Sequence, residues 1–110
     1  MGVTKTEIFT ETQNQIASVA KALAHPARIA ILQHIFSKNT CICGDLVDEI
    51  GLAQATISQH LRELKKAEII KGTISGTSVC YCINEVVWDD NRTLISNFLN
   101  TNTTFSSSCC

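Results

Sequence analysis

The sequence lacks the features that mark membrane, secreted and strongly basic proteins. Its apolar runs are far shorter than a membrane-spanning helix needs, so we expect no membrane segment. Residues 1–15 are polar and contain no apolar core of a secretory signal, which predicts a cytoplasmic protein. The net charge is −1, so overall composition does not indicate nucleic-acid binding. In the cytoplasm cysteine thiols stay reduced, which favours metal binding or redox sensing over structural disulfides.

The sequence features of a thiol enzyme are also missing. No histidine lies close in sequence to either Cys-x-Cys pair, and a nucleophilic cysteine needs a nearby base. Neither pair has the Cys-x-x-Cys spacing of thioredoxin-like motifs. We therefore expect that the protein is not an enzyme.

The length and the charge distribution suggest one small domain with a positive middle part. We expect a single domain over residues 1–103 and a mobile, cysteine-containing tail over residues 104–110. Residues 52–83 carry four cations and two carboxylates, whereas residues 84–110 carry one cation and three carboxylates. The sign of the charge therefore changes along the chain.

Apolar spacing and turn residues predict the order helix, helix, short strand, helix, helix, hairpin, helix. A capping box of Thr4 and Glu7 predicts the start of the first helix, Pro26 the start of the second, and Gly51 the end of the third. The expected helices lie within residues 5–23, 26–39, 44–51, 52–70 and about 89–100, with a hairpin over residues 69–83. A helix-turn-helix followed by a hairpin predicts a winged helix-turn-helix, mainly α with a small β-sheet.

Three segments then resemble a known family. The stretches ALAHPARIAIL, DLVDEIGLAQATISQHLRELKKAEII and GTSVCYCI are similar to the bacterial ArsR/SmtB-type metalloregulatory repressors, over residues 20–83. The resemblance implies a homodimeric repressor that binds double-stranded operator DNA with an inverted repeat and releases it when an inducer binds. We expect the first and last helices to form the dimer contact, because their apolar stripes need a partner.

The second helix of the predicted helix-turn-helix carries the candidate DNA-binding residues. We expect Ala53, Ile57, Leu61 and Leu64 to be buried, which leaves a polar outer face. Glutamine can contact adenine, arginine can contact guanine, and lysine binds phosphate. His60 lies beside the buried face, so we expect it to be packed. The candidate DNA-binding residues are Gln54, Thr56, Ser58, Gln59, Arg62 and Lys65.

Two Cys-x-Cys pairs are expected to meet on paired strands. The short strand around Ile42 should pair with the second strand of the wing, and alternate residues of a strand share one face. If Ile42 faces the core, its two neighbouring cysteines face away from it. Val79, Tyr81 and Ile83 are likewise the core candidates of the second strand, so its cysteines should face away too. The candidate metal ligands are therefore Cys41, Cys43, Cys80 and Cys82, with Cys109 and Cys110 as ligands from the tail.

Several ligands and one other chemistry fit such a group of thiols. Thiolates select soft ions, so As(III) or Sb(III) as the inducer is the leading hypothesis, and Zn²⁺ is the main competitor. Family members that sense soft metals often carry Cys-x-Cys directly before Asp-Leu, whereas here the pair is displaced by one residue. None of the three histidines lies in the last helix, which disfavours the family's His/carboxylate metal sites. A thiol redox or persulfide sensor of the same fold is the alternative, and buried, inert cysteines remain a third interpretation.

Overall fold

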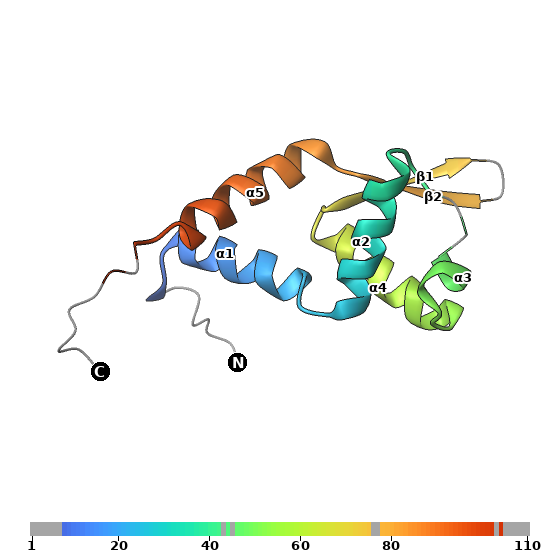
Figure 1. Ribbon diagram of the computed structural model, residues 1–110, viewed down its shortest axis with the longest axis horizontal. Helices are drawn as coiled ribbons and strands as arrows, with labels where there is room; N and C mark the ends of the chain where they lie inside the picture. Colours follow the sequence, from blue (N-terminus) through green and yellow to red (C-terminus); the bar gives the residue numbers. More distant parts are fainter. Residues whose placement is uncertain (1–7, 43, 45, 76–77, 103, 105–110) are drawn as a thin grey trace.

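The computed structural model describes residues 8–42, 44, 46–75, 78–102 and 104. These residues form five helices and two antiparallel strands, arranged as a winged helix-turn-helix (Figure 1). The helices are α1 (Glu11–Ala22), α2 (Pro26–Lys38), α3 (Leu46–Ile50), α4 (Gln54–Lys66) and α5 (Glu85–Leu99), and the strands are β1 (Ile70–Ser75) and β2 (Ser78–Ile83). None of these helices is long and apolar enough to cross a membrane.

The first helix begins later than residue 5, so this part of the prediction is wrong. Residues 8–10 precede α1, and the Thr10 hydroxyl accepts a hydrogen bond from the Gln13 amide at 3.0 Å. The Gln13 side chain in turn accepts from the Thr10 amide at 2.9 Å. This reciprocal pair is a capping box, which satisfies amides that the first turn leaves unbonded. The capping box expected at Thr4 and Glu7 lies outside the described residues.

The last helix begins earlier than residue 89. The Asn84 side chain accepts a hydrogen bond from the Val87 amide, so the helix starts directly after β2. This early start matters for the site because it places the first turn of α5 beside the end of the wing. An asparagine N-cap is a local signal, and Asn84 could have been recognised from sequence alone.

The boundaries of α2 and α3 follow the sequence prediction, whereas α4 is shorter than the stretch of residues 52–70 in which it was expected. Pro26 occupies the first turn of α2, where its missing N–H costs nothing, and α2 ends at Asn39 with a left-handed φ of 54°. Gly51, with a φ of 85°, separates α3 from α4. A side chain at this φ would be strained, so glycine allows the tight turn between the two helices.

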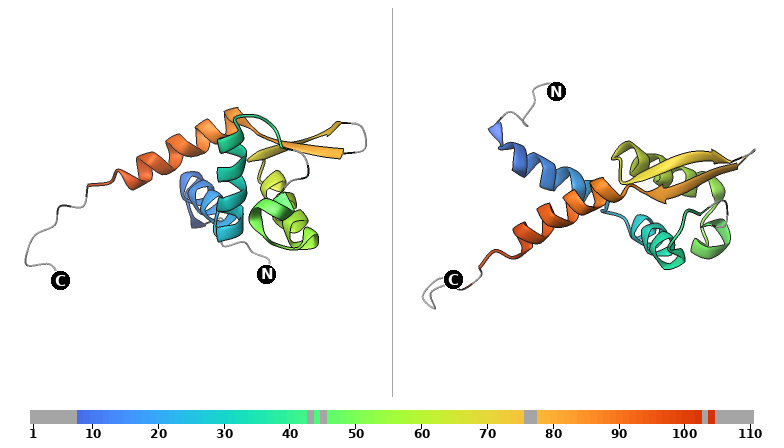
Figure 2. Two further views of the ribbon diagram at one scale, coloured as in Figure 1. Left: turned by 45° about the vertical axis from the view of Figure 1, so that its right-hand side comes forward. Right: turned by 90° about the horizontal axis from the view of Figure 1, so that it is seen from above.

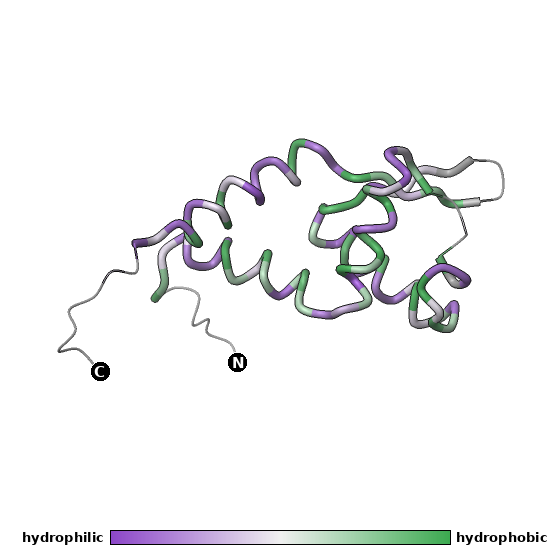
Figure 3. The backbone as a smooth tube through the Cα atoms, viewed as in Figure 1, coloured by the Kyte–Doolittle hydropathy of each residue, from purple (hydrophilic) through white to green (hydrophobic). Residues whose placement is uncertain are grey.

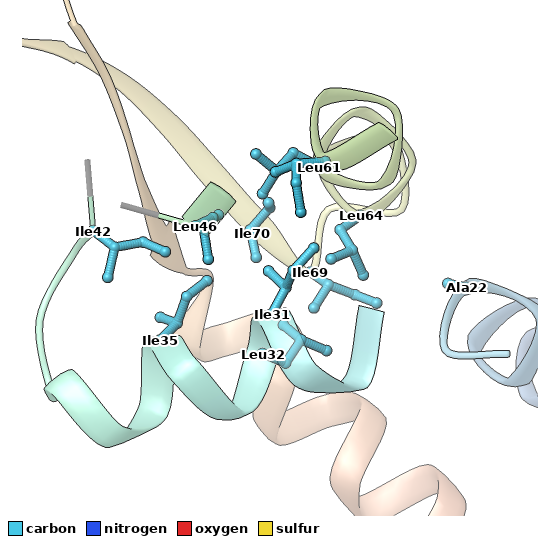
Figure 4. Close-up of a cluster of buried hydrophobic side chains, with 11 residues drawn as sticks. Ala22, Ile31, Leu32, Ile35, Ile42, Leu46, Leu61, Leu64, Ile69 and Ile70 are labelled. Atoms are coloured by element: carbon cyan, nitrogen blue, oxygen red, sulfur yellow. The ribbon is translucent and has the colours of Figure 1, made fainter. Parts of the chain in front are cut away.

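The hydrophobic core lies between α2, α4, the start of β1 and the short segment before α3 (Figure 4). Ile31 and Leu64 are completely buried, and Ile57 is 1% exposed. Ala53 was expected in this core but is exposed, because it is the N-cap of α4 and lies before the buried stripe begins. The helix-turn-helix therefore packs on α2 with a stripe that starts one turn later than predicted.

The hairpin is joined by a third short segment, as expected. The Ile42 amide donates to the Tyr81 carbonyl at 2.9 Å, and the Tyr81 amide donates to the Ile42 carbonyl at 2.8 Å. Ile42 is buried, and Tyr81 and Ile83 pack against the core. Val79 was also a core candidate, but it is 42% exposed because the hairpin projects beyond the helices (Figures 1 and 2).

Helices α1 and α5 contact each other away from this core (Figures 1 and 2). Apolar and polar positions alternate along both helices (Figure 3). None of the residues of α5, all of which are described, is buried, and Ala22 is the only buried residue of α1. The two helices thus leave much of their apolar surface open to solvent.

Candidate nucleic-acid interface and thiol site

Helix α4 presents a polar and positive outer face. Gln54, Thr56, Gln59 and Arg62 are exposed, and Ser58 is partly exposed. The Gln54 side-chain amide donates to the Ser58 hydroxyl at 3.0 Å, so these two candidate DNA-binding residues are connected along the helix. Over its length α4 has three cations and one carboxylate. Such a face can donate hydrogen bonds to base edges and attract phosphates.

Lys65 lies differently from the other candidates. A Cβ atom built on Gly72 of β1 would lie only 3.3 Å from the Lys65 Nζ atom and 3.4 Å from a ring carbon of Tyr81. The ammonium group of Lys65 therefore lies over the base of the wing, next to Tyr81. Because Gly72 has no side chain, α4 and the hairpin can approach this closely.

A buried histidine fixes the inner side of α4. His60 is 7% exposed, which agrees with the expectation that it is packed. Its Nδ1 atom accepts a hydrogen bond from Arg28 Nε at 3.1 Å, and its ring centre lies 4.4 Å from that of His25. Burial lowers the pKa of His60, and the charges of His25 and Arg28 lower it further. Arg28 also donates to the Ala22 carbonyl at 3.2 Å, so it connects the end of α1 to α4.

Cys41 and Cys82 form a disulfide bond across the short sheet. Their Cα atoms are 4.3 Å apart. The neighbouring residues Ile42 and Tyr81 exchange both backbone hydrogen bonds, so Cys41 and Cys82 occupy the adjacent position without such bonds. Side chains approach most closely at that position of an antiparallel pair. The strand pairing therefore accounts for the contact between two cysteines that lie 41 positions apart.

The remaining cysteines are described only in part. Cys80 is also disulfide-bonded, and it is 7% exposed without belonging to the hydrophobic core cluster. Cys43, Cys109 and Cys110 lie outside the described residues. Within the described ranges, no three His, Cys, Asp or Glu side chains come together as a metal site. Reduction of the Cys41–Cys82 bond would offer two thiolates at one place, which is a partial donor set for a soft ion.

A pocket of about 330 Å³ lies beside the disulfide, where α2 ends and α5 begins. Phe36 and Trp88 both line it and contact each other, with ring centres 5.0 Å apart. Sequence analysis did not find this pocket, nor the contact of Arg28 with His60. The single tryptophan, placed close behind a Cys-x-Cys pair, was the available signal for the pocket.

The fold and the exposed polar helix define a winged helix-turn-helix domain, and comparisons with known proteins agree. Residues 23–73 match the family model described as a helix-turn-helix domain. The transcriptional repressor SdpR of Bacillus subtilis is 31% identical over 83 residues, which make up 76% of this chain and 91% of that protein. The transcriptional repressor SmtB of Mycobacterium tuberculosis is 37% identical over 71 residues, or 64% of this chain and 52% of that protein. The chain belongs to the ArsR/SmtB family of transcriptional regulators.

Solved structures support the same fold. The transcriptional repressor BigR of Xylella fastidiosa aligns with a TM-score of 0.63 at 20% identity, covering 93% of this chain and all of that one. The homodimeric winged helix-turn-helix domain of Mb0332 from Mycobacterium bovis aligns with a TM-score of 0.62 at 21% identity, covering 96% and 98%. At these identities the likeness shows the fold alone.

Proposed function

We propose that this protein is a homodimeric, DNA-binding transcriptional repressor that releases its operator when the thiols at the base of the wing change state. The observation that carries the proposal is the contact of Cys41 with Cys82 next to the Ile42–Tyr81 backbone pair. This contact joins a pair of chemically reactive groups to β2, which pairs with β1, the strand that contacts the DNA-binding helix. The names of the repressors SdpR and SmtB support the repressor role.

The DNA contact is assigned to the outer face of α4. In helix-turn-helix proteins the N-terminal part of this helix meets the base edges, which favours Gln54, Thr56, Ser58 and Gln59 as the residues that select sequence. Arg62 lies one turn further on and suits a phosphate or a guanine. Because Lys65 lies over β1, it contributes to the positive electrostatic potential near the wing rather than to base contacts.

The dimer contact is assigned to α1 and α5. Phe98 is 54% exposed and Leu99 is 71% exposed, although both are large apolar residues. An open hollow of about 980 Å³ lies between α1, α5 and the turn after α4, and Phe9 and Leu94 contribute to its lining. A second copy would bury these side chains, and the homodimeric relative Mb0332 has the same fold. Two copies would present two α4 helices to an inverted repeat.

Tyr81 provides the connection from the thiols to α4. Its backbone is bonded to Ile42, and the two residues flanking it are Cys80 and Cys82. Its side chain lines a space of about 280 Å³ together with Ile57 and Ser58 of α4. A change at the sulfur atoms that shifts this strand would therefore shift the surface on which α4 rests.

Two triggers fit the thiols. The first is As(III) or Sb(III) bound to cysteine thiolates. It takes a third sulfur ligand in addition to Cys41 and Cys82, and Cys43, Cys80, Cys109 and Cys110 are the candidates. Zn²⁺ would need four ligands. The second is oxidation, which needs only two thiols, and the disulfide between Cys41 and Cys82 specifically favours it. The name of SmtB does not discriminate between these triggers.

DNA binding is tested with operator sequences selected by the reduced protein from random duplexes. Arg62→Ala should weaken binding by about 1–3 kcal/mol if it contacts a base, and Gln59→Ala by a similar amount. Lys38→Ala is the matched control, because it also removes one positive charge, at the exposed end of α2 and outside the proposed DNA and dimer contacts. Equal losses for Arg62→Ala and Lys38→Ala would contradict the assignment of the DNA contact to α4.

The trigger is tested by fluorescence anisotropy of the same duplex. One titration uses arsenite with a thiol-free reductant, and the other uses a thiol oxidant without metal. Release by arsenite that is lost in Cys41→Ser and Cys109→Ser supports a metalloid site closed by the tail. Release by oxidant alone supports the redox sensor. If neither treatment weakens DNA binding, the proposed thiol trigger is wrong.

A further inference from the structure

The pocket beside the disulfide has both apolar and polar lining residues, and these include Cys41 and Cys82. It is formed by the last turn of α2, the following loop, the end of β2 and the first turn of α5, all within the described ranges. Cys41 is exposed and Cys82 is partly exposed, so a small molecule in the pocket can reach the bond between them. The lining residues that matter for ligand choice are Phe36, Cys41, Cys82, Glu85, Trp88 and Asp89.

One wall of the pocket is aromatic. Phe36 is 42% exposed, and its ring is tilted against that of Trp88. The faces of such rings attract cations, and tryptophan is the strongest of the aromatic residues in this respect. A short carbon chain that ends in a positive group therefore fits this wall better than one that ends in a negative group.

The charged groups of the lining point to the same ligand charge. Glu85 and Asp89 are its only charged residues, and both are negative. Asp89 is partly neutralised by Arg92, with 3.1 Å between the charged atoms, so Glu85 contributes most to the negative potential. An anionic molecule would meet repulsion at this mouth, whereas a cationic one would be attracted.

We propose that this pocket binds a small aminothiol, a molecule with a thiol and a protonated amine a few carbons apart, which exchanges with the Cys41–Cys82 disulfide. The thiolate of the aminothiol attacks the sulfur of the more exposed residue, Cys41. The bond between Cys41 and Cys82 breaks, a mixed disulfide forms on Cys41, and Cys82 leaves as a thiolate. The proton lost by the aminothiol goes to solvent, and a second aminothiol completes the reduction by releasing the symmetrical disulfide.

This inference deepens the proposed thiol trigger and rests on its oxidised form. It names the class of reductant that would reset the switch in preference to anionic thiols. The test uses no DNA. A failure here therefore leaves the repressor function standing, and a protein that does not bind DNA can still be tested for exchange.

The experiment compares the rates at which three thiols of different charge react with the oxidised full-length protein. Cysteamine is positive, 2-mercaptoethanol is neutral, and 3-mercaptopropionate is negative. Each rate is divided by the rate of the same thiol with bis(2-hydroxyethyl) disulfide, which removes differences in intrinsic reactivity. The fluorescence of Trp88, the only tryptophan, follows the pocket, and peptide mass spectrometry locates the mixed disulfide.

We expect the corrected rate of cysteamine to exceed that of neutral 2-mercaptoethanol by about fivefold at low salt, the factor that a contact between unit charges produces in a water-like dielectric. Its preference over 3-mercaptopropionate, which is repelled by the same contact, should be about the square of this factor, about 25-fold. Glu85→Gln should lower this preference at least by half, and added salt should lower it in the wild type. Phe36→Leu should also lower the preference for the cationic thiol, because it removes one aromatic face while leaving the charge of the protein unchanged. The matched control is Asp90→Asn, because Asp90 is also an acidic residue near the start of α5 but does not line this pocket.

Three results would overturn the proposal. The first is equal corrected rates for the cationic and the anionic thiol. The second is an equal effect of Asp90→Asn and Glu85→Gln, which would show that net charge and not the pocket decides. The third is a protein in which mild oxidation forms no bond between Cys41 and Cys82. A mixed disulfide on Cys41, with the cationic preference reduced only by the pocket variants, would support the proposal.

Discussion

Reduction of the Cys41–Cys82 bond should lower the stability of the domain by a predictable amount. The bond closes a loop between residues 41 positions apart, which contains α3, α4 and the hairpin. Loop closure of this length restricts the unfolded chain and stabilises the folded one by about 4 kcal/mol. The value is large against the 5–15 kcal/mol that is typical of whole domains. The oxidised and reduced proteins should therefore differ clearly in any unfolding experiment.

The measurement is urea unfolding of the Cys80→Ser variant with and without a reductant, at one protein concentration. This variant removes the second disulfide, in which Cys80 takes part, so that among the described cysteines only the bond between Cys41 and Cys82 responds. If the free energy of unfolding falls by about 2 kcal/mol per molar urea, the urea concentration at the unfolding midpoint should fall by about 2 M on reduction. The control combines Cys80→Ser with Cys82→Ser, which keeps Cys41 but cannot close the loop.

The control variant decides whether the reasoning is right. Its midpoint should not depend on the reductant, and it should match that of the reduced Cys80→Ser variant. A midpoint that is the same in both redox states of Cys80→Ser would refute the loop-closure argument. An equal response of the control would show that another pair of cysteines, and not Cys41 with Cys82, stabilises the fold.

Three further predictions concern coupling, pH and the core. Tyr81→Leu should leave thiol oxidation or metalloid binding intact but weaken the release of DNA, measured by thiol titration and anisotropy on the same sample. Because burial, His25 and Arg28 lower the pKa of His60 below 6.5, the unfolded chain takes up the proton first. Stability should therefore fall as the pH drops below 6.5, and His60→Gln should flatten this part of the urea-midpoint profile. Leu64→Ala should cost about 2–5 kcal/mol in thermal unfolding, since Leu64 is completely buried.

Local sequence signals accounted for most of the secondary structure. Pro26 and Gly51 act through their own backbone preferences, so their effect on α2 and α3 needs no distant partner. The errors at the starts of α1 and α5 also had a local origin. Thr10 and Asn84 cap these helices, whereas the sequence prediction began the first helix at the capping box of Thr4 and Glu7 and the last helix from apolar spacing alone. The prediction that Ala53 lies in the core was wrong, because periodicity alone does not show at which residue a buried stripe begins.

The sequence by itself determined the winged helix-turn-helix order, the polar face of α4 and the presence of paired cysteines, because each depends on residues a few positions apart. Only the tertiary structure decided which of these groups meet. The Ile42–Tyr81 pair sets the strand register and thereby brings Cys41 to Cys82. The packing of α2 against α4 brings Arg28 to His60. Such contacts depend on how whole elements pack, and the free energy of packing is shared by many side chains rather than encoded in any short motif.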